Sequence, residues 1–206
     1  MSETDEKQTL QRSLQNARGV LLWKLEGLSD YDIRRPVTPT GTNLLGLVKH
    51  CAGVECGYFG TVMGRPFPGQ GDLDWNDKEM NGDMYATAAE SREQVTDFYR
   101  RVWAHSDATI SELPLDASGT VSWWPQERRH PTLHTLLVHT IQETARHAGH
   151  ADIIRELIDG AAGLRDGLSN MPAEAGTASW KQYYDKLDQI ARSGQAPPAA
   201  VTPDRT

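Results

Sequence analysis

One segment, residues 132–159, constrains the fold of this chain more than any other part of the sequence. It contains no proline and is followed by Gly160, so its pattern is best tested on a helical wheel. With Glu143 set at zero, His139 falls at roughly −40°, His147 at roughly +40° and His150 at roughly −20°. Four titratable side chains therefore share one narrow stripe of a long predicted helix.

Apolar residues occupy the same stripe of that wheel. Leu136 and Ile154 fall at roughly +20° and Leu157 at roughly −40°, so the stripe is predicted to face the core of a helical bundle. Burying a carboxylate and several imidazoles without partners costs several kcal/mol. Hydrogen bonds among them, a water-filled cavity or a bound metal ion could each offset that cost, and the sequence leaves all three open.

Two residues of the stripe are spaced to grip one ion, because Glu143 and His147 lie four apart on one helix face. Helix bundles build metal sites from inward-facing ligands on neighbouring helices, which makes His50, at the edge of the core face of another helix, the candidate third ligand. Two imidazoles and one carboxylate suit zinc, or else nickel or another first-row ion. Three protein ligands also leave one coordination position open, as catalytic zinc sites do.

Glycines line one side of the predicted helix that carries His50. Each costs a helix about 1 kcal/mol relative to alanine, so the pattern needs an explanation. Close helix packing is one explanation, and a pocket floor beside His50 is the other. The glycines are Gly46, Gly53, Gly57, Gly60 and Gly64.

The remaining patterns predict an all-α fold, a four-helix bundle with a long crossover loop and an extra C-terminal helix. We expect one domain over residues 1–192, and a disordered C-terminal tail over residues 193–206. Long loops are expected over 65–85 and 114–131. The predicted helices cover residues 6–28, 43–63, 87–113, 132–159 and 178–192.

Charge and composition exclude several classes of protein. The formal net charge is −7 and there is no cluster of Lys and Arg, which argues against nucleic-acid or anionic membrane partners. No apolar run approaches the roughly 20 residues needed to span a bilayer. Cys51 and Cys56 fall on different faces of one predicted helix, so no disulfide is expected. These features, with the polar start MSETDEKQ, predict a cytoplasmic protein.

Two stretches resemble the DinB-like family of metal-binding four-helix bundles. LLGLVKHCAGVECGYFG is similar to the family's second helix, whose histidine is the first ligand, and HTIQETARHAGHADIIREL is similar to its last bundle helix. In many members a histidine stands at the position of Glu143, and the glutamate resembles that of the mycothiol-dependent maleylpyruvate isomerases. The resemblance covers roughly residues 8–160 and implies the metal ligands His50, Glu143 and His147.

The same resemblance implies a function. Relatives include transferases that use mycothiol or bacillithiol, so we expect a divalent-metal-dependent transferase or isomerase. It would hold a low-molecular-weight thiol as a metal-bound thiolate and pass it to a small electrophile. His150 is the candidate catalytic residue, as a proton shuttle or a hydrogen-bond partner of a ligand. A non-catalytic stress-response protein that binds a metal or small molecule is the alternative.

The loop before residue 132 offers candidate substrate-binding residues. Trp123 and Trp124 could form a lid over the metal, and Arg128 and Arg129 could meet an anionic group of the substrate, although tryptophans that only clamp a loop are the alternative. Tyr58 could donate a hydrogen bond in the pocket. Apolar stripes on the first helix and on residues 180–187 also predict a homodimer.

Overall fold

The structure is a computed structural model that describes residues 2–194 apart from 77, 166, 170 and 173–175. The chain forms two compact units, Met1–Ser169 and Asn170–Thr206. Residues 195–206 of the predicted tail lie outside the described residues, and the grouping of residues 1–192 into one domain stays a prediction. The α-helices are α1 Glu3–Trp23, α2 Asp30–Arg34, α3 Leu44–Glu55, α4 Arg92–Glu112, α5 Leu133–Asp159 and α6 Thr177–Ser193.

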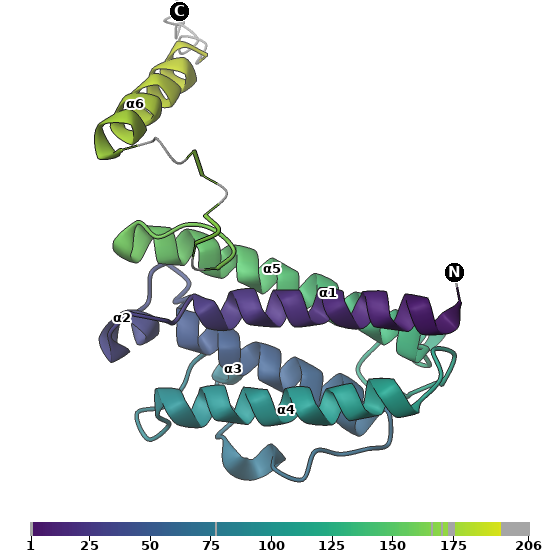
Figure 1. Cartoon of the computed structure of the whole chain (residues 1–206). Coiled ribbons are helices and arrows are strands. Elements are labelled where there is room, and N and C mark those ends of the chain that lie inside the picture. The colour runs from purple at the N-terminus through teal and green to yellow at the C-terminus, as the bar shows by residue number, and fades with distance from the viewer. Residues whose placement is uncertain (1, 77, 166, 170, 173–175, 195–206) are drawn as a thin grey trace, which may run out of the picture. The chain divides into compact units, whose positions relative to one another are not determined.

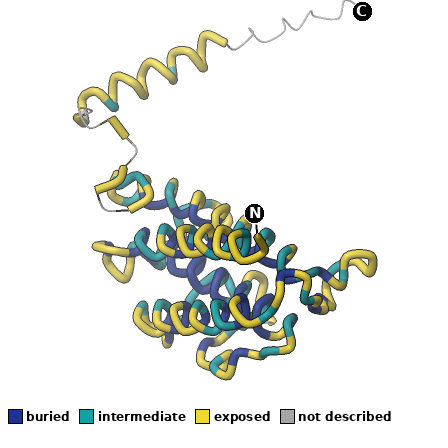
Figure 2. Tube along the Cα trace, turned by 45° about the vertical axis from the view of Figure 1, so that its right-hand side comes forward, coloured by how far each residue is buried: buried dark blue, intermediate teal, exposed yellow. Residues whose placement is uncertain are grey.

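The fold class is confirmed as an all-α bundle of the DinB-like type. Within the first unit, α1 packs against α4 and α5, and α3 packs against the same two helices, so the four long helices form a closed ring (Figure 1). Buried residues lie on the inward faces of these helices (Figure 2). No strand occurs among the described residues, and no described helix is long and apolar enough to cross a membrane.

Caps in the sequence explain where the helices begin. The side chain of Asn43 accepts a hydrogen bond from the backbone N–H of Gly46 and so begins α3, while Ser91 and Thr132 begin α4 and α5 in the same way. Gly160, with φ of 78°, ends α5 in the left-handed conformation that glycine adopts most easily.

Two predicted helices differ from the observed ones. The helix predicted over 6–28 ends earlier, because α1 stops at Trp23 and residues 24–27 form turns; a separate short helix, α2, follows and is capped by Ser29. The helix predicted over 43–63 is α3 continued by a π-helix, η1 Cys56–Val62. Short 3₁₀ turns interrupt the two predicted loops, namely η2 Gln70–Asp72, η3 Gly82–Met84 and η4 Gln126–Arg128.

The titratable stripe of α5 was wrongly placed at the centre of its core face. His147 is buried and Glu143 is half-buried, but His150 is exposed and Leu157 is 66% exposed. The buried face is centred further round the helix, because small and hydroxyl side chains fill the tight space against α1 and α3. They are Thr140, Thr144, Ala148 and Ala151. The stripe therefore lies at the rim of the core, where a ligand can reach it.

Candidate metal centre

Two helices bring the three predicted ligands together. His50 comes from α3, Glu143 and His147 come from α5, and one ligand atom from each lies within 4.8 Å of the others. The rings of His50 and His147 meet edge to face, with centroids 4.6 Å apart. Because α3 packs against α5, the contact that builds the bundle also builds this cluster.

The Nε2 atoms of both imidazoles face the Glu143 carboxylate. His147 Nε2 lies 3.2 Å from Glu143 Oε1, and His50 Nε2 lies 3.7 Å from the same oxygen. His50 Nε2 is buried and has no hydrogen-bond partner among the described residues. A buried nitrogen without a partner costs free energy, so this atom fits a metal ligand better than a purely structural group.

The Nδ1 atom of each imidazole has a partner on the outer side. Asp83 Oδ2 lies 2.6 Å from His50 Nδ1, and His150 Nδ1 lies 3.3 Å from His147 Nδ1. A hydrogen bond at one ring nitrogen sets the tautomer, which leaves the other nitrogen free to bind a metal. Both imidazoles are thus held with Nε2 directed at the same point.

The ionisation states of the cluster also suit a cation. Burial lowers the pKa of His147, and the neighbouring His50 lowers it further, against the opposing effect of Glu143. Burial works to raise the pKa of Glu143, but the charges of His147 and the other nearby imidazoles bring it below its usual value. At neutral pH the cluster therefore offers a neutral imidazole and a carboxylate, the forms that bind metals.

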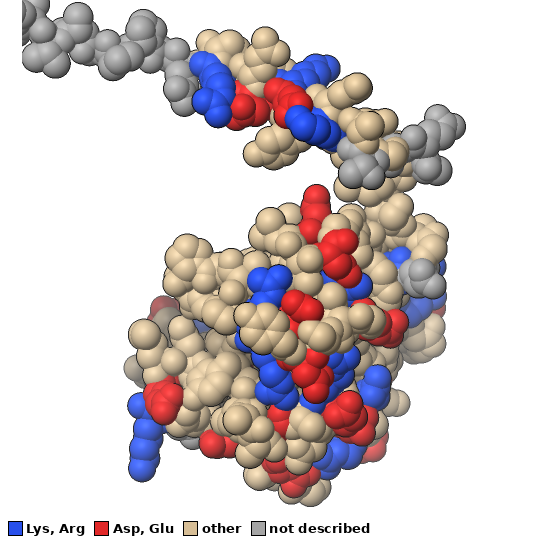
Figure 3. All heavy atoms as spheres, turned by 90° about the vertical axis from the view of Figure 1, so that its left-hand side faces the viewer, with Lys and Arg blue, Asp and Glu red and all other residues tan. Residues whose placement is uncertain are grey.

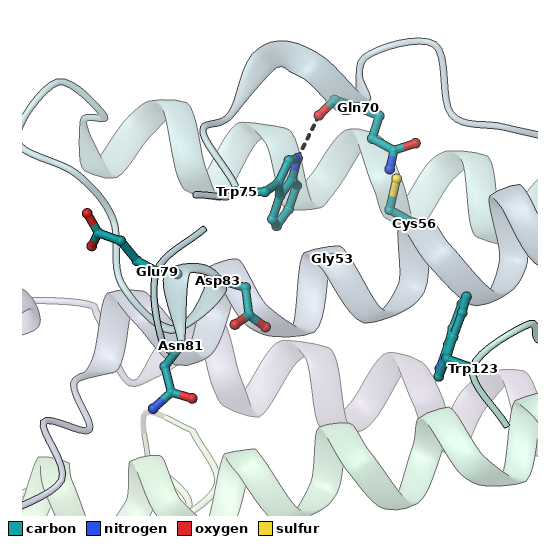
Figure 4. A pocket seen from close by; sticks show the side chains of 9 residues that line it. Gly53, Cys56, Gln70, Trp75, Glu79, Asn81, Asp83 and Trp123 are labelled. Atoms are coloured by element: carbon teal, nitrogen blue, oxygen red, sulfur yellow. Dashed lines mark hydrogen bonds between the residues drawn. The ribbon is translucent and has the colours of Figure 1, made fainter. Parts of the chain in front are cut away.

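A cavity of about 600 Å³ is lined in part by Asp83, the partner of His50, while none of the three candidate ligands is among its described lining residues. Gly53 and Cys56 of α3 and η1 form one wall, Trp75 and Asp83 come from the loop of residues 65–85, and Trp123 comes from the loop before α5 (Figure 4). Gln70, Glu79, Asn81 and Gly82 complete the lining. Asp83 joins the two features, because it lines the cavity and binds His50.

Close packing and a pocket floor were the two explanations for the glycines along one side of α3 and η1, and each applies to a different glycine. An added Cβ at Gly46 would lie 1.8 Å from the Met84 carbonyl oxygen, so Gly46 serves close packing. Gly53 lines the cavity beneath the Trp75 ring, 2.9 Å from an added Cβ, and so forms part of the predicted pocket floor.

The predicted lid residues are gathered around Tyr58, but only Trp123 reaches the cavity. The Tyr58 ring lies 5.9 Å from that of Trp123 and 5.8 Å from that of Trp124, whose Nε1 donates a hydrogen bond to the Tyr58 hydroxyl. Arg128 is stacked on Trp124. Arg128 and Arg129 are absent from the cavity lining described here, so their role stays a prediction.

Sequence reasoning missed Asp83, Trp75 and Glu79. They lie in a segment that was read only as a loop, and no periodicity marks their approach to α3. The acidic residues of NDKEMNGDM and the tryptophan before them were the only available signal, and such residues are common in exposed loops.

A protein-family model described as mycothiol-S-transferase matches residues 9–160, a stretch that includes the whole histidine and glutamate cluster. None of the curated proteins compared with the chain matches it.

Proposed function

Because this chain belongs to the mycothiol-S-transferase family, a DinB-like family, we propose that it transfers the sulfur of a low-molecular-weight thiol to a small electrophile in a metal-dependent reaction. The observation that carries the proposal is the unpartnered Nε2 of His50, which faces Glu143 and His147, while Asp83, the partner of His50, lines a cavity of small-molecule size.

His50 and His147 would hold a divalent ion through Nε2, and Glu143 would hold it through a carboxylate oxygen. Zinc is the favoured ion, because two imidazoles and one carboxylate are a familiar catalytic zinc set. When bound there, a divalent ion would lower the pKa of a coordinated thiol and so favour its thiolate form at neutral pH.

The sulfur must come from a cosubstrate, since the cysteines of the chain are poor nucleophiles. Burial raises the pKa of the Cys56 thiol to about 11, and burial also raises the pKa of Cys51. At neutral pH both are therefore neutral thiols, whereas the thiolate is the reactive form. Cys56 contributes to the cavity wall without competing for the electrophile.

The cavity favours an uncharged or cationic part of the cosubstrate. Its described lining carries the carboxylates of Glu79 and Asp83 and no Lys or Arg. The side-chain amides of Gln70 and Asn81 make no hydrogen bond to another described residue, so they are free to bind polar groups of a ligand. A thiol with carboxylates should therefore bind less well than a neutral polar thiol.

His150 would hold the His147 ring in place from the side that faces away from the metal. It is exposed, and its Nδ1 lies 3.3 Å from Nδ1 of His147. With His147 bonded to the metal through Nε2, its Nδ1–H would donate to His150 and keep the ring in the required tautomer.

The proposal is tested with zinc-loaded protein, an alkyl chloride electrophile and three thiols: mycothiol, glutathione and cysteine. We expect formation of the thioether with release of chloride, with mycothiol preferred over glutathione because glutathione carries two carboxylates. His134→Ala should retain the activity and His50→Ala should lose it. Zinc binding without consumption of any thiol would instead favour a non-catalytic binding protein.

A further inference from the structure

We propose that Asp83 is a positioning residue, which fixes the His50 ring so that its Nε2 is presented to the metal. The inference rests on the metal site of the proposed function, and it concerns a residue outside the ligand set. Asp83 Oδ2 lies 2.6 Å from His50 Nδ1, which is shorter than the 3.2 and 3.3 Å contacts of the His147 ring nitrogens. A carboxylate there accepts the Nδ1–H and leaves the lone pair on Nε2.

Asp83, the partner of His50, carries a negative charge, whereas the partner of His147 is another histidine, His150. His147 has a second histidine at its Nδ1, whereas His50 has an acid. A carboxylate that accepts from an imidazole N–H makes the opposite nitrogen a stronger ligand, which a neutral partner does less well. The two histidines should therefore depend to different extents on their partners.

The loop is seated on α3 one helical turn before His50. The Asn43 side chain donates a hydrogen bond to the Met84 carbonyl, next in the chain to Asp83, while it also caps α3. Gly46 leaves room for that carbonyl, since an added Cβ would lie 1.8 Å from its oxygen. Gly46 and His50 are four residues apart and share a helix face. The contact of Met84 with Gly46 therefore places the neighbouring Asp83 close to Nδ1 of His50.

Glu90, which is paired with a buried lysine, holds both ends of the segment 74–87 that contains Asp83. Glu90 Oε1 accepts the backbone N–H of Asp74 at 2.8 Å, and Glu90 Oε2 accepts that of Thr87 at 2.7 Å. Lys49, the neighbour of His50 in α3, is fully buried and pairs with Glu90 at 2.9 Å. The segment that contains Asp83 is thus attached to α3, the helix that carries His50. This attachment restricts the position of Asp83 relative to His50.

Zinc affinity, measured by competition with a chelating indicator, tests this role without an activity assay. We expect Asp83→Ala to weaken zinc binding by about 10–100-fold, the usual effect of losing such a partner. Asp83→Asn should weaken it less, because the amide oxygen can still accept the hydrogen bond. Glu79→Gln is the matched control: it removes the same charge from the same loop and cavity wall, but Glu79 binds Tyr85 instead of a ligand.

A second variant tests the seat of the loop. Gly46→Ala touches no ligand, yet its methyl group would displace Met84, and we expect it to weaken zinc binding in the same direction as Asp83→Ala. Circular dichroism of each variant without metal, compared with that of the wild type, separates a local effect from loss of fold.

The outcomes separate this inference from the function on which it rests. The positioning role would be overturned if folded Asp83→Ala bound zinc as tightly as the wild type. It would also be overturned if Glu79→Gln lost as much zinc affinity as Asp83→Ala. In both cases the metal site itself would stand. A wild-type protein without zinc affinity would overturn both. Weaker zinc binding by Asp83→Ala supports the role even if the wild-type protein transfers no thiol.

Discussion

Each imidazole of the candidate centre faces Glu143 through one ring nitrogen and is held in place through the other. His50 and His147 present Nε2 to Glu143 and are held at Nδ1 by Asp83 and His150. Such outer contacts reduce the entropy lost when a ligand is fixed in one rotamer. The metal affinity of this protein should therefore depend on both sets of residues, and most on the atoms that bind directly.

Removal of either imidazole should abolish stoichiometric metal binding. We expect about one divalent ion per chain in the wild type and none above background in His50→Ala or His147→Ala, since two remaining ligands cannot complete a tight site. Elemental analysis measures the ion. His134→Ala is the control, because His134 lies elsewhere on α5 and binds Glu6 at 3.1 Å. Equal loss in all three variants would contradict the assignment.

The two cysteines should resist alkylation at neutral pH. With the pKa of Cys56 raised from 9.0 to about 11, its thiolate fraction at pH 8 is about 100-fold below that of an ordinary thiol. The rate of iodoacetamide labelling should therefore rise with pH through about 11. Mass spectrometry of the labelled peptides measures the rate. Rapid labelling of Cys56 at pH 7 would show that the thiol is activated and could act in the reaction.

At the scale of the helices, a buried charged layer divides the core of the bundle. Arg18 lies in α1 between Leu14 and Leu21, which belong to different apolar clusters. The Arg18 Nε donates to Glu55 of α3 at 2.9 Å, and both side chains are fully buried. The Tyr99 hydroxyl of α4 also donates to Glu55. This layer joins three helices and fixes how they are aligned along the bundle.

Loss of one charge from this layer should be costly. Glu55→Gln leaves Arg18 buried without its main counter-ion, and breaking such a pair typically costs about 3–5 kcal/mol. Urea unfolding of the metal-free protein measures the loss. Asp107→Asn removes the second, more exposed partner of Arg18 and should cost less. A loss for Glu55→Gln no greater than that for Asp107→Asn would show that the layer adds little to stability.

For the whole molecule, the distribution of polar and apolar surface bears on its partners. On the face drawn in Figure 3, acidic and basic side chains are interspersed. The apolar stripe of α1 that was predicted as a dimer surface is largely buried in the bundle. Helix α6 keeps its own apolar stripe, in which Tyr183, Tyr184, Leu187 and Ile190 are exposed.

We predict a homodimer that depends on α6. Exposed apolar residues on one face of a helix favour association, and a two-fold interface is the commonest kind. Light scattering at micromolar concentration should give the dimer mass for the wild type and the monomer mass for Leu187→Glu. Gln182→Glu adds the same charge on the polar face of α6 and should remain dimeric. A monomeric wild type would make the prediction wrong.

Local patterns in the sequence determined the helices and the candidate ligands. The caps at Asn43, Ser91 and Thr132 act within four residues, so they could be read directly from the chain. The spacing of Glu143 and His147 is likewise a property of one helix. His50 could be paired with them because its position at the edge of its own core face limited the choice.

The tertiary structure alone decided which residues surround these ligands. Asp83 reaches His50 across 33 residues, through a carbonyl seated on Gly46 and a loop held by Glu90, and no periodic pattern encodes such an approach. Arg18 and Glu55 look solvent-exposed in sequence, because charged residues are buried only when a distant partner is supplied. The helices and the candidate ligand residues on each helix follow from patterns within a few residues of the chain. The contacts that orient the imidazoles and set the charge around them depend on packing between segments far apart in the chain.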